Sequence, residues 1–249
     1  MNPKAPIKLS ADEIALVRSM VLYEDAEVLV LNKPAGLSSQ GGRGQANTLD
    51  ELLWAFAKSN GNRPRLVHRL DRDTSGVILT ARTKPAAGFL GKALMNRKFR
   101  KTYNAIVTPG PPAPPSGVIE APLRRVEQGR EVYMRVCEAD HPEAESAKSV
   151  YRTLAAGPDA ALLEMEPHTG RMHQLRVHLA SIGRPIVGDA RYGGALMAAG
   201  LPAPRVMLHA ALLGFPHPAG GTKWIKAPLP DDFSALLAGL GLADDQAVA

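Results

Sequence analysis

The stretch His68-Arg69-Leu70-Asp71-Arg72-Asp73-Thr74-Ser75-Gly76-Val77-Ile78-Leu79-Thr80 places two carboxylates, two guanidiniums, an imidazole and two hydroxyls between apolar segments. Leu66-Val67 precedes the polar residues and Val77-Ile78-Leu79 follows them, which predicts a polar bend between two strands. Loops that leave strand ends are where a rigid scaffold holds reactive groups, so this bend is a candidate site. On charge alone it is equally well explained as a hydrophilic hairpin.

The pattern His-Arg-Leu-Asp-x-x-Thr-Ser-Gly in residues 68–76 resembles the signature of the RluA-type family of RNA pseudouridine synthases. Other blocks of that family resemble three further segments of this chain. These are Asn32-Lys33-Pro34-Ala35-Gly36-Leu37, Lys101-Thr102-Tyr103-Asn104-Ala105 and Pro167-His168-Thr169-Gly170-Arg171-Met172-His173-Gln174-Leu175-Arg176-Val177-His178. The resemblance extends from about Val28 to about Pro218.

The fold that the resemblance implies is an α+β catalytic domain, built on a mixed, mostly antiparallel extended sheet flanked by helices and loops. The second half of the sequence supports this independently, because strand patterns separated by Gly and Pro turns dominate it. We expect residues 1–20 to be an N-terminal extension, residues 21–243 to be the catalytic domain and residues 244–249 to be a flexible tail. The proline-rich segment 108–117 is predicted to be a stiff loop of unassigned role.

Several elements can be predicted from local patterns alone. Ser10 and Thr48 each precede a Glu by three residues, which indicates capped helices, the second ending near Gly61 to Pro64. Strands are expected at 65–70, 77–82, 101–107, 118–123, 131–136, 149–154 and 161–166. Further helices are expected from Thr83, from Met172 and from Asp231, with Phe89, Leu90 and Leu94 facing inward in the first of these.

The resemblance assigns the catalytic carboxylate to Asp71, acting on the ribose as a nucleophile or as a base. Arg176 is expected to pair with Asp71 and keep it ionised, since a buried carboxylate needs a cation beside it. Tyr103 offers an aromatic face on which a flipped uracil can stack. The alternatives are that Asp71 caps the turn, that Arg176 binds a phosphate or a surface acid, and that Tyr103 packs in the core.

Substrate contacts are expected in the same motifs. Arg69 is predicted to fill the gap left by the extruded uridine, because alternation in an extended segment places it on the same side as Asp71. His68 points the other way, and a hydrogen bond within the turn is its simpler role. The complete set of predicted substrate-binding residues is Lys33, His68, Arg69, Arg72, Thr74, Arg171, His173 and Leu175.

The amino-acid composition indicates which kind of partner the protein binds and in which cellular compartment it works. The chain has 249 residues, 45% of them hydrophobic, and a formal net charge of +6, which favours a folded protein with a polyanionic partner. The single cysteine, Cys137, rules out an internal disulfide and suggests a reducing compartment. We therefore expect a cytoplasmic monomer that binds a stem-loop of ribosomal or transfer RNA and has no membrane association.

Other chemistries fit the sequence less well. On a helix, His173 and His178 are rotated roughly 140° apart, so they do not share a face, and neither a metal nor another cofactor is expected. Asp71 and Asp73 lie on one tight turn and cannot straddle a sugar, which disfavours a two-carboxylate glycosidase. The alternative from another class is a non-catalytic RNA-binding protein or RNA chaperone that uses the same basic cleft.

Overall fold

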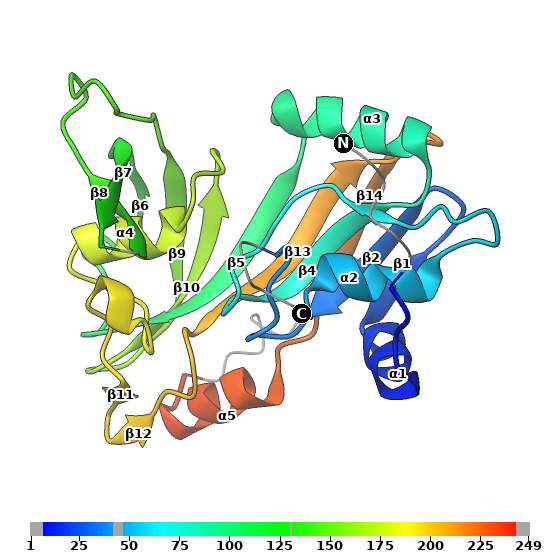
Figure 1. Ribbon diagram of the computed structural model, residues 1–249. Coiled ribbons are helices and arrows are strands. Elements are labelled where there is room, and N and C mark those ends of the chain that lie inside the picture. Colours follow the sequence, from blue (N-terminus) through cyan, green and yellow to red (C-terminus); the bar gives the residue numbers. More distant parts are fainter. Residues whose placement is uncertain (1–6, 42–46, 130, 243–249) are drawn as a thin grey trace. The chain divides into compact units, whose positions relative to one another are not determined.

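The computed structural model describes residues 7–41, 47–129 and 131–242, and the chain divides into two compact units (Figure 1). Unit 1 comprises the described residues up to Arg100 together with Ala210–Pro228. Unit 2 comprises Lys101–His209 and the described residues from Leu229 onward. The chain passes between the units three times: after Arg100, within a strand between His209 and Ala210, and after Pro228.

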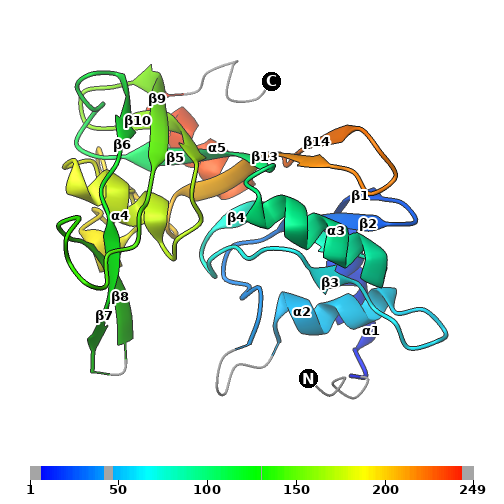
Figure 2. The same cartoon turned by 90° about the horizontal axis from the view of Figure 1, so that it is seen from above.

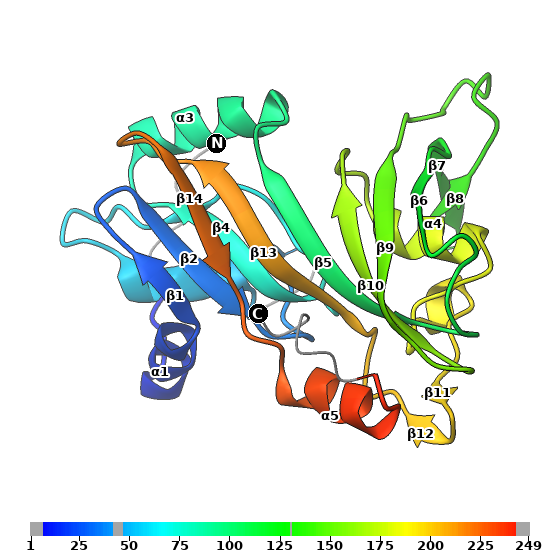
Figure 3. The same cartoon turned by 180° about the vertical axis from the view of Figure 1, so that it is seen from behind.

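Unit 1 is an antiparallel sheet with helices. Its elements are α1 (Ala11–Ser19), β1 (Val21–Glu24), β2 (Val28–Lys33), α2 (Leu49–Leu52), the 3-10 helix η1 (Leu53–Phe56), β3 (Arg65–Leu66), β4 (Ser75–Ala81), α3 (Lys84–Met95), the part of β13 (Leu208–Pro216) from Ala210 onward, and β14 (Thr222–Lys226). β1, β2, β4 and β13 are hydrogen-bonded neighbours in that order, and β14 pairs with β13 (Figure 3). Both β2 and β4 are almost entirely buried, which explains their continuous apolar runs.

Unit 2 contains a second set of antiparallel strands. Its elements are β5 (Arg100–Val107), β6 (Ser116–Ile119), β7 (Leu123–Gln128), β8 (Glu131–Val136), β9 (Ser149–Ala156), β10 (Ala161–Pro167), α4 (Gln174–Ser181), the 3-10 helix η2 (Ala190–Tyr192), β11 (Met197–Ala198), β12 (Leu201–Pro202) and α5 (Asp231–Gly239). The strand order is β5, β10, β9, β6. The hairpin of β7 and β8 lies beside α4 (Figure 2).

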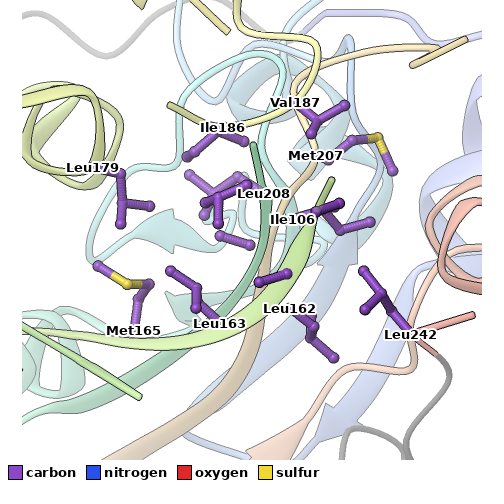
Figure 4. Close-up of a cluster of buried hydrophobic side chains, with 14 of the residues drawn as sticks. Ile106, Leu162, Leu163, Met165, Leu179, Ile186, Val187, Met207, Leu208 and Leu242 are labelled. Atoms are coloured by element: carbon purple, nitrogen blue, oxygen red, sulfur yellow. The ribbon is translucent and has the colours of Figure 1, made fainter. Parts of the chain in front are cut away.

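The core of unit 2 is a cluster of fully buried aliphatic side chains (Figure 4). Ile106 of β5 lies opposite Leu162 of β10, whereas Leu163 lies opposite Ala105, so the side chains of the cluster occupy both faces of these strands, with Leu179 of α4 in the same cluster. At about 25 cal/mol for each Å² of apolar surface removed from water, such residues supply the main stabilising free energy. The α+β class with mostly antiparallel strands is thereby confirmed.

Two predicted elements are shorter than the sequence suggested. The strand expected at 65–70 ends at Leu66, because the Leu79 amide, which would continue the ladder, donates instead to Nε2 of His68 at 3.1 Å. The helix that begins after Thr48 has the predicted capping box but ends at Phe56, tightening to 3-10 geometry before the polar turn at residues 58–62. The prediction for 118–123 was also wrong in extent, since β6 ends at Ile119 and β7 begins at Leu123.

Helix α3 begins at its predicted cap, Thr83, and buries Leu90 as expected. Phe89 was predicted to face inward, but its side chain is 44% exposed. The buried residues are Ala86, Leu90 and Ala93, and together they define the inward face of the helix. Phe89 lies at the edge of that face, and residues 88 and 91 lie on the opposite side.

The predicted N-terminal extension is part of unit 1 where the structure describes it. Helix α1 begins at the Ser10 capping box, as predicted, and buries Val17 completely. The Arg18 guanidinium lies 5.3 Å from the centre of the Phe56 ring and donates to the carbonyl of Ala55 at 3.2 Å. The predicted tail, 244–249, lies outside the described residues, and the single catalytic domain at 21–243 stays a prediction.

In the described part of the chain, no helix is both long and apolar enough to cross a membrane.

His178 on α4 gives unit 2 a predictable pH dependence. Its ring lies 2.9 Å from the Ser149 hydroxyl and 3.0 Å from the Ala121 carbonyl oxygen. Burial lowers the pKa of His178 below its usual value of 6.5, and the bond to Ala121 only partly opposes this. The unfolded chain therefore binds a proton here more readily than the folded one, so stability falls as the pH drops below about 6.5.

We expect the urea midpoint to decrease between about pH 7.5 and about pH 5.5, and His178→Gln to weaken that decrease. The matched control is His168→Gln, which removes an exposed histidine. A pH dependence that is the same in wild type and His178→Gln would contradict the assignment.

Candidate active site

The segment that carries Asp71 is fixed to unit 1 by hydrogen bonds on both sides of the carboxylate. The Ser39 hydroxyl donates to the Leu70 carbonyl at 2.7 Å and accepts from the Leu70 amide at 3.1 Å. The Thr74 amide bonds to the Asp71 carbonyl at 3.2 Å, which closes the predicted turn. Leu70 is buried while Asp71 is partly exposed, so the backbone is anchored and the carboxylate remains accessible.

Lys33 also holds the segment that carries Asp71, through hydrogen bonds to backbone carbonyls. The Lys33 side chain is fully buried, and its ammonium donates to the carbonyls of Pro34 and Leu37 at 2.8 Å and of Arg72 at 3.0 Å. The Gly36 amide also donates to the Arg72 carbonyl. The sequence predicted a substrate contact for Lys33, but its donors are directed at backbone oxygens. These bonds suit a positioning role for Lys33 in the Asp71 segment, and its predicted contact with substrate stays a prediction.

Lys33→Met should lower the free energy of unfolding by about 3 kcal/mol. Methionine keeps the aliphatic stem but leaves buried carbonyl oxygens without a charged donor, at about 1 to 3 kcal/mol for each such loss. We expect catalytic turnover to fall as well, because the Asp71 segment loses an anchor.

Urea unfolding of Lys33→Met beside Lys58→Met measures the effect, because Lys58 is an exposed lysine of the same unit. The exposed substitution should change stability by less than about 0.5 kcal/mol. Equal, small changes in both variants would show that the ammonium of Lys33 does not hold the segment.

The other predicted contacts in this motif differ in accessibility. Arg69 is exposed, and Arg72 is exposed with its Nε donating to Asp73 at 3.0 Å. Thr74 and His68 are buried, and the His68 ring accepts from the Leu79 amide. The bond of His68 reaches strand β4 and not a group within the turn, whereas both arginines are exposed, and the substrate contacts of all three stay predictions.

Tyr103 lies on β5 of unit 2, opposite Met165 of β10. Its side chain is partly buried and packs against the aliphatic core, so one part of the ring is supported and another part is open. Lys101 lies two residues earlier, on the same face of the strand. Burial lowers the pKa of Lys101 below its usual value of 10.5. The sequence motif contained this lysine, but no role had been assigned to it.

Arg176 lies on α4 and forms a bidentate pair with Asp189. Its Nε and Nη2 each lie 2.7 Å from a different carboxylate oxygen, and both side chains are buried. The guanidinium is also 5.0 Å from the centre of the Tyr192 ring. Asp189 and Tyr192 fix the plane of the guanidinium, and neither was chosen from the sequence, although both lie within the stretch to which the family resemblance extends. The predicted pair of Arg176 with Asp71 joins residues of different units and stays a prediction.

His173 belongs to the same cluster around Tyr192. Its backbone is left-handed, with a φ of 52°, and its Nδ1 lies 2.7 Å from the Tyr192 hydroxyl, which also accepts from the Met134 amide. Arg171 is directed elsewhere, to Glu145 at 2.6 Å and to the Ser146 carbonyl. Leu175 packs in the aliphatic core and only 6% of its surface is exposed, so little of it is accessible to a substrate. Its contact with substrate stays a prediction.

Metal ligation can be examined for the same residues. In residues 7–41, 47–129 and 131–242, no three His, Cys, Asp or Glu side chains are grouped so that they could hold a metal ion. The ionic groups of the candidate site are instead arginines, lysines and single carboxylates, which suit the binding of phosphates and the protonation chemistry of a sugar or base.

Comparison with known proteins places these residues in a family. The pattern of the RNA pseudouridylate synthase family matches residues 27–181, a range that includes Asp71, Tyr103 and Arg176. Ribosomal large subunit pseudouridine synthase C of Haemophilus ducreyi is 37% identical over 249 residues, which cover 96% of this chain and 75% of that protein. Ribosomal large subunit pseudouridine synthase D of Zymomonas mobilis is 36% identical, over a match that covers 87% of this chain and 71% of that protein.

A mitochondrial relative and a solved structure agree with this assignment. RNA pseudouridine synthase 4, mitochondrial, of Arabidopsis thaliana is 39% identical over 210 residues, which cover 76% of this chain and 44% of that protein. The solved structure of human RNA Pseudouridylate Synthase Domain Containing 4 superposes with a TM-score of 0.77 at 27% identity, covering 94% of this chain and 98% of that one. By sequence and by fold, the chain belongs to the RNA pseudouridylate synthase family.

Proposed function

We propose that this chain converts uridine to pseudouridine in ribosomal RNA, with Asp71 as the catalytic carboxylate. The enzyme class, an isomerase acting on uridine in RNA, follows from the family. The single observation that supports the role of Asp71 is its placement: a partly exposed carboxylate on a backbone segment held by Ser39 and Lys33, within the matched region. Such preorganisation is what catalysis at a sugar carbon requires.

The reaction is balanced without a redox partner. The bond from uracil N1 to ribose C1′ breaks, the base rotates, and C1′ bonds to uracil C5. The proton on C5 leaves to water, and N1 regains a proton. Asp71 attacks the sugar as a nucleophile or removes a proton from it as a base, and both roles require the ionised form.

Tyr103 and Arg176 complete the proposed catalytic set. A uracil stacked on the Tyr103 ring gains about 1 to 3 kcal/mol, which offsets part of the cost of leaving the RNA stack. Asp189 fixes the plane of the Arg176 guanidinium, and we propose, as the family resemblance implies, that Arg176 stabilises the ionised carboxylate of Asp71. Arg69 and Arg72, both exposed, are proposed to contact the RNA around the extruded nucleotide.

Ribosomal RNA is the proposed substrate because relatives over most of the chain are named for the large ribosomal subunit. We propose a stem-loop as the recognised element, a monomer as the active form and the cytoplasm as the compartment. The decisive experiment supplies ribosomal or transfer RNA that carries tritium at uracil C5 and counts tritium released to water. Release from ribosomal RNA alone supports the proposal, and release from transfer RNA alone would reassign the substrate. Binding of both RNAs without release would favour a non-catalytic RNA-binding protein.

A further inference from the structure

Helix α3 of unit 1 has an outer face that no described residue covers. Its inward face is formed by Ala86, Leu90 and Ala93. On the opposite side, the helical positions of Lys84, Gly88, Gly91, Lys92 and Met95 fall on one face. All of these are exposed except Gly91, which is intermediate, and Met95 is 76% exposed. In Figure 1 this helix lies at the edge of unit 1.

Two glycines occupy the middle of this face at a cost to helix stability. Glycine in a helix interior is less favourable than alanine, because the unfolded chain loses more freedom. An added Cβ would meet nothing within 4 Å at Gly88 or at Gly91. Packing within the described protein therefore does not demand glycine at either position. What the missing side chains provide is a shallow surface where the backbone of a ligand can approach the helix.

The end of the helix has a third feature that works against stability. The Arg97 amide bonds to the Leu94 carbonyl at 3.0 Å and the Lys98 amide to the Ala93 carbonyl at 2.9 Å, which is a Schellman motif. Its left-handed position, where glycine is preferred, is occupied by Arg97 with a φ of 55°. Phe99, which follows the turn, packs against unit 1. Its ring centre lies 6.1 Å from that of Phe215 and 6.4 Å from that of His68.

The charged side chains of α3 and of the turn that follows it are all positive, and the carboxylate of Glu27 lies at the helix N-cap, where it accepts a hydrogen bond from the Thr83 hydroxyl at 2.8 Å. Between Asp73 and Glu120 the sequence contains no carboxylate, whereas α3 and the following turn carry Lys84, Lys92, Arg97, Lys98 and Arg100. In the portions of the chain that the structure describes, none of these five side chains has a hydrogen bond or an ion pair with the protein. The unpaired cations can bind the charges of a polyanion, and the glycines leave room for its backbone to lie close to the helix.

We propose that this outer face of α3, which we call the α3 surface, binds the phosphodiester backbone of the RNA substrate away from the modified uridine. The lysines and arginines neutralise successive phosphates, the two glycines let the strand lie close to the helix, and Arg97 holds its guanidinium at the helix end. This inference rests on the proposed function, because RNA is the polyanion that the chain is expected to bind.

The test uses full-length protein carrying Asp71→Asn, so that binding is measured without turnover. Filter binding of bulk ribosomal RNA over a range of salt concentrations compares this background with added Arg97→Gly, Gly88→Gln or Lys58→Gln. Arg97→Gly should raise the thermal midpoint, because glycine suits the left-handed turn, so loss of folding cannot explain its effect. It should weaken RNA binding about 3- to 10-fold and lower the slope of log affinity against log salt by about 0.7 to 0.9.

Gly88→Gln should likewise raise the midpoint and weaken binding, because its side chain obstructs the surface without altering charge. Lys58→Gln removes an exposed cation elsewhere in unit 1 and should leave the affinity unchanged within about twofold. Unaltered affinity and salt slope in both α3 variants would overturn the proposal. So would a dimer of the wild type that Gly88→Gln dissociates, since the α3 surface would then bind a second copy.

The tritium assay on protein with Asp71 intact keeps the two proposals separate. Tritium release by wild type with no effect of Arg97→Gly on binding refutes the α3 surface alone. No release by wild type, with the binding losses as expected, refutes the isomerase proposal and leaves the α3 surface supported.

Discussion

Asp71→Asn is expected to reduce tritium release from uracil C5 by about 10³-fold or more, with RNA affinity changed little. Asparagine preserves the size of the side chain and its hydrogen-bonding oxygen, but it can neither attack C1′ nor accept a proton. Loss of a positioned acid or base alone costs about 10² to 10⁴ in rate, and loss of a nucleophile removes the covalent route altogether. The measurement is single-turnover tritium release beside filter binding of the same RNA.

Asp73→Asn is the matched control. Asp73 lies in the same turn, carries the same charge and pairs with the exposed Arg72 at 3.0 Å, with about a third of its side chain exposed. Its removal should leave the rate within a fewfold of wild type, because exposed ion pairs contribute little. Comparable losses in the two variants would mean that the local charge matters and that Asp71 has no distinct chemical role.

Gly76→Ala is expected to give the largest loss of stability, about 4 kcal/mol. A Cβ at Gly76 would lie 2.2 Å from the carbonyl oxygen of Ala210, and the backbone has a φ of 113° that alanine rarely adopts. Overpacking costs about 1 to 3 kcal/mol, and backbone strain adds about 1 to 3 kcal/mol. Because β4 continues directly from the Asp71 segment, activity should be lost together with stability.

Gly61→Ala separates the two causes. Gly61 has a φ of 76°, but a Cβ there would meet nothing within 4 Å. Only the backbone cost applies, so the loss should be about 1 kcal/mol. Urea unfolding of both variants provides the comparison, and equal losses would show that β4 and β13 separate without cost.

Local sequence was sufficient for most of the secondary structure. The capping boxes at Ser10 and Thr48 form as predicted, and β8 has the predicted limits, because caps and alternation depend on residues a few positions apart. The failures have non-local causes. The strand after Arg65 ends early because a histidine ring takes a hydrogen bond that a backbone carbonyl would otherwise accept.

The sequence by itself determined the family, the fold class and the motif around Asp71, since these are written in residue identities and their spacing. Only the tertiary structure decided which groups hold the site. Lys33 is directed to the Arg72 carbonyl, 39 positions away, Ser39 to Leu70, and Arg176 to Asp189. A lysine or arginine forms equally good bonds with many acceptors, so its partner depends on which distant segments the packed core brings together.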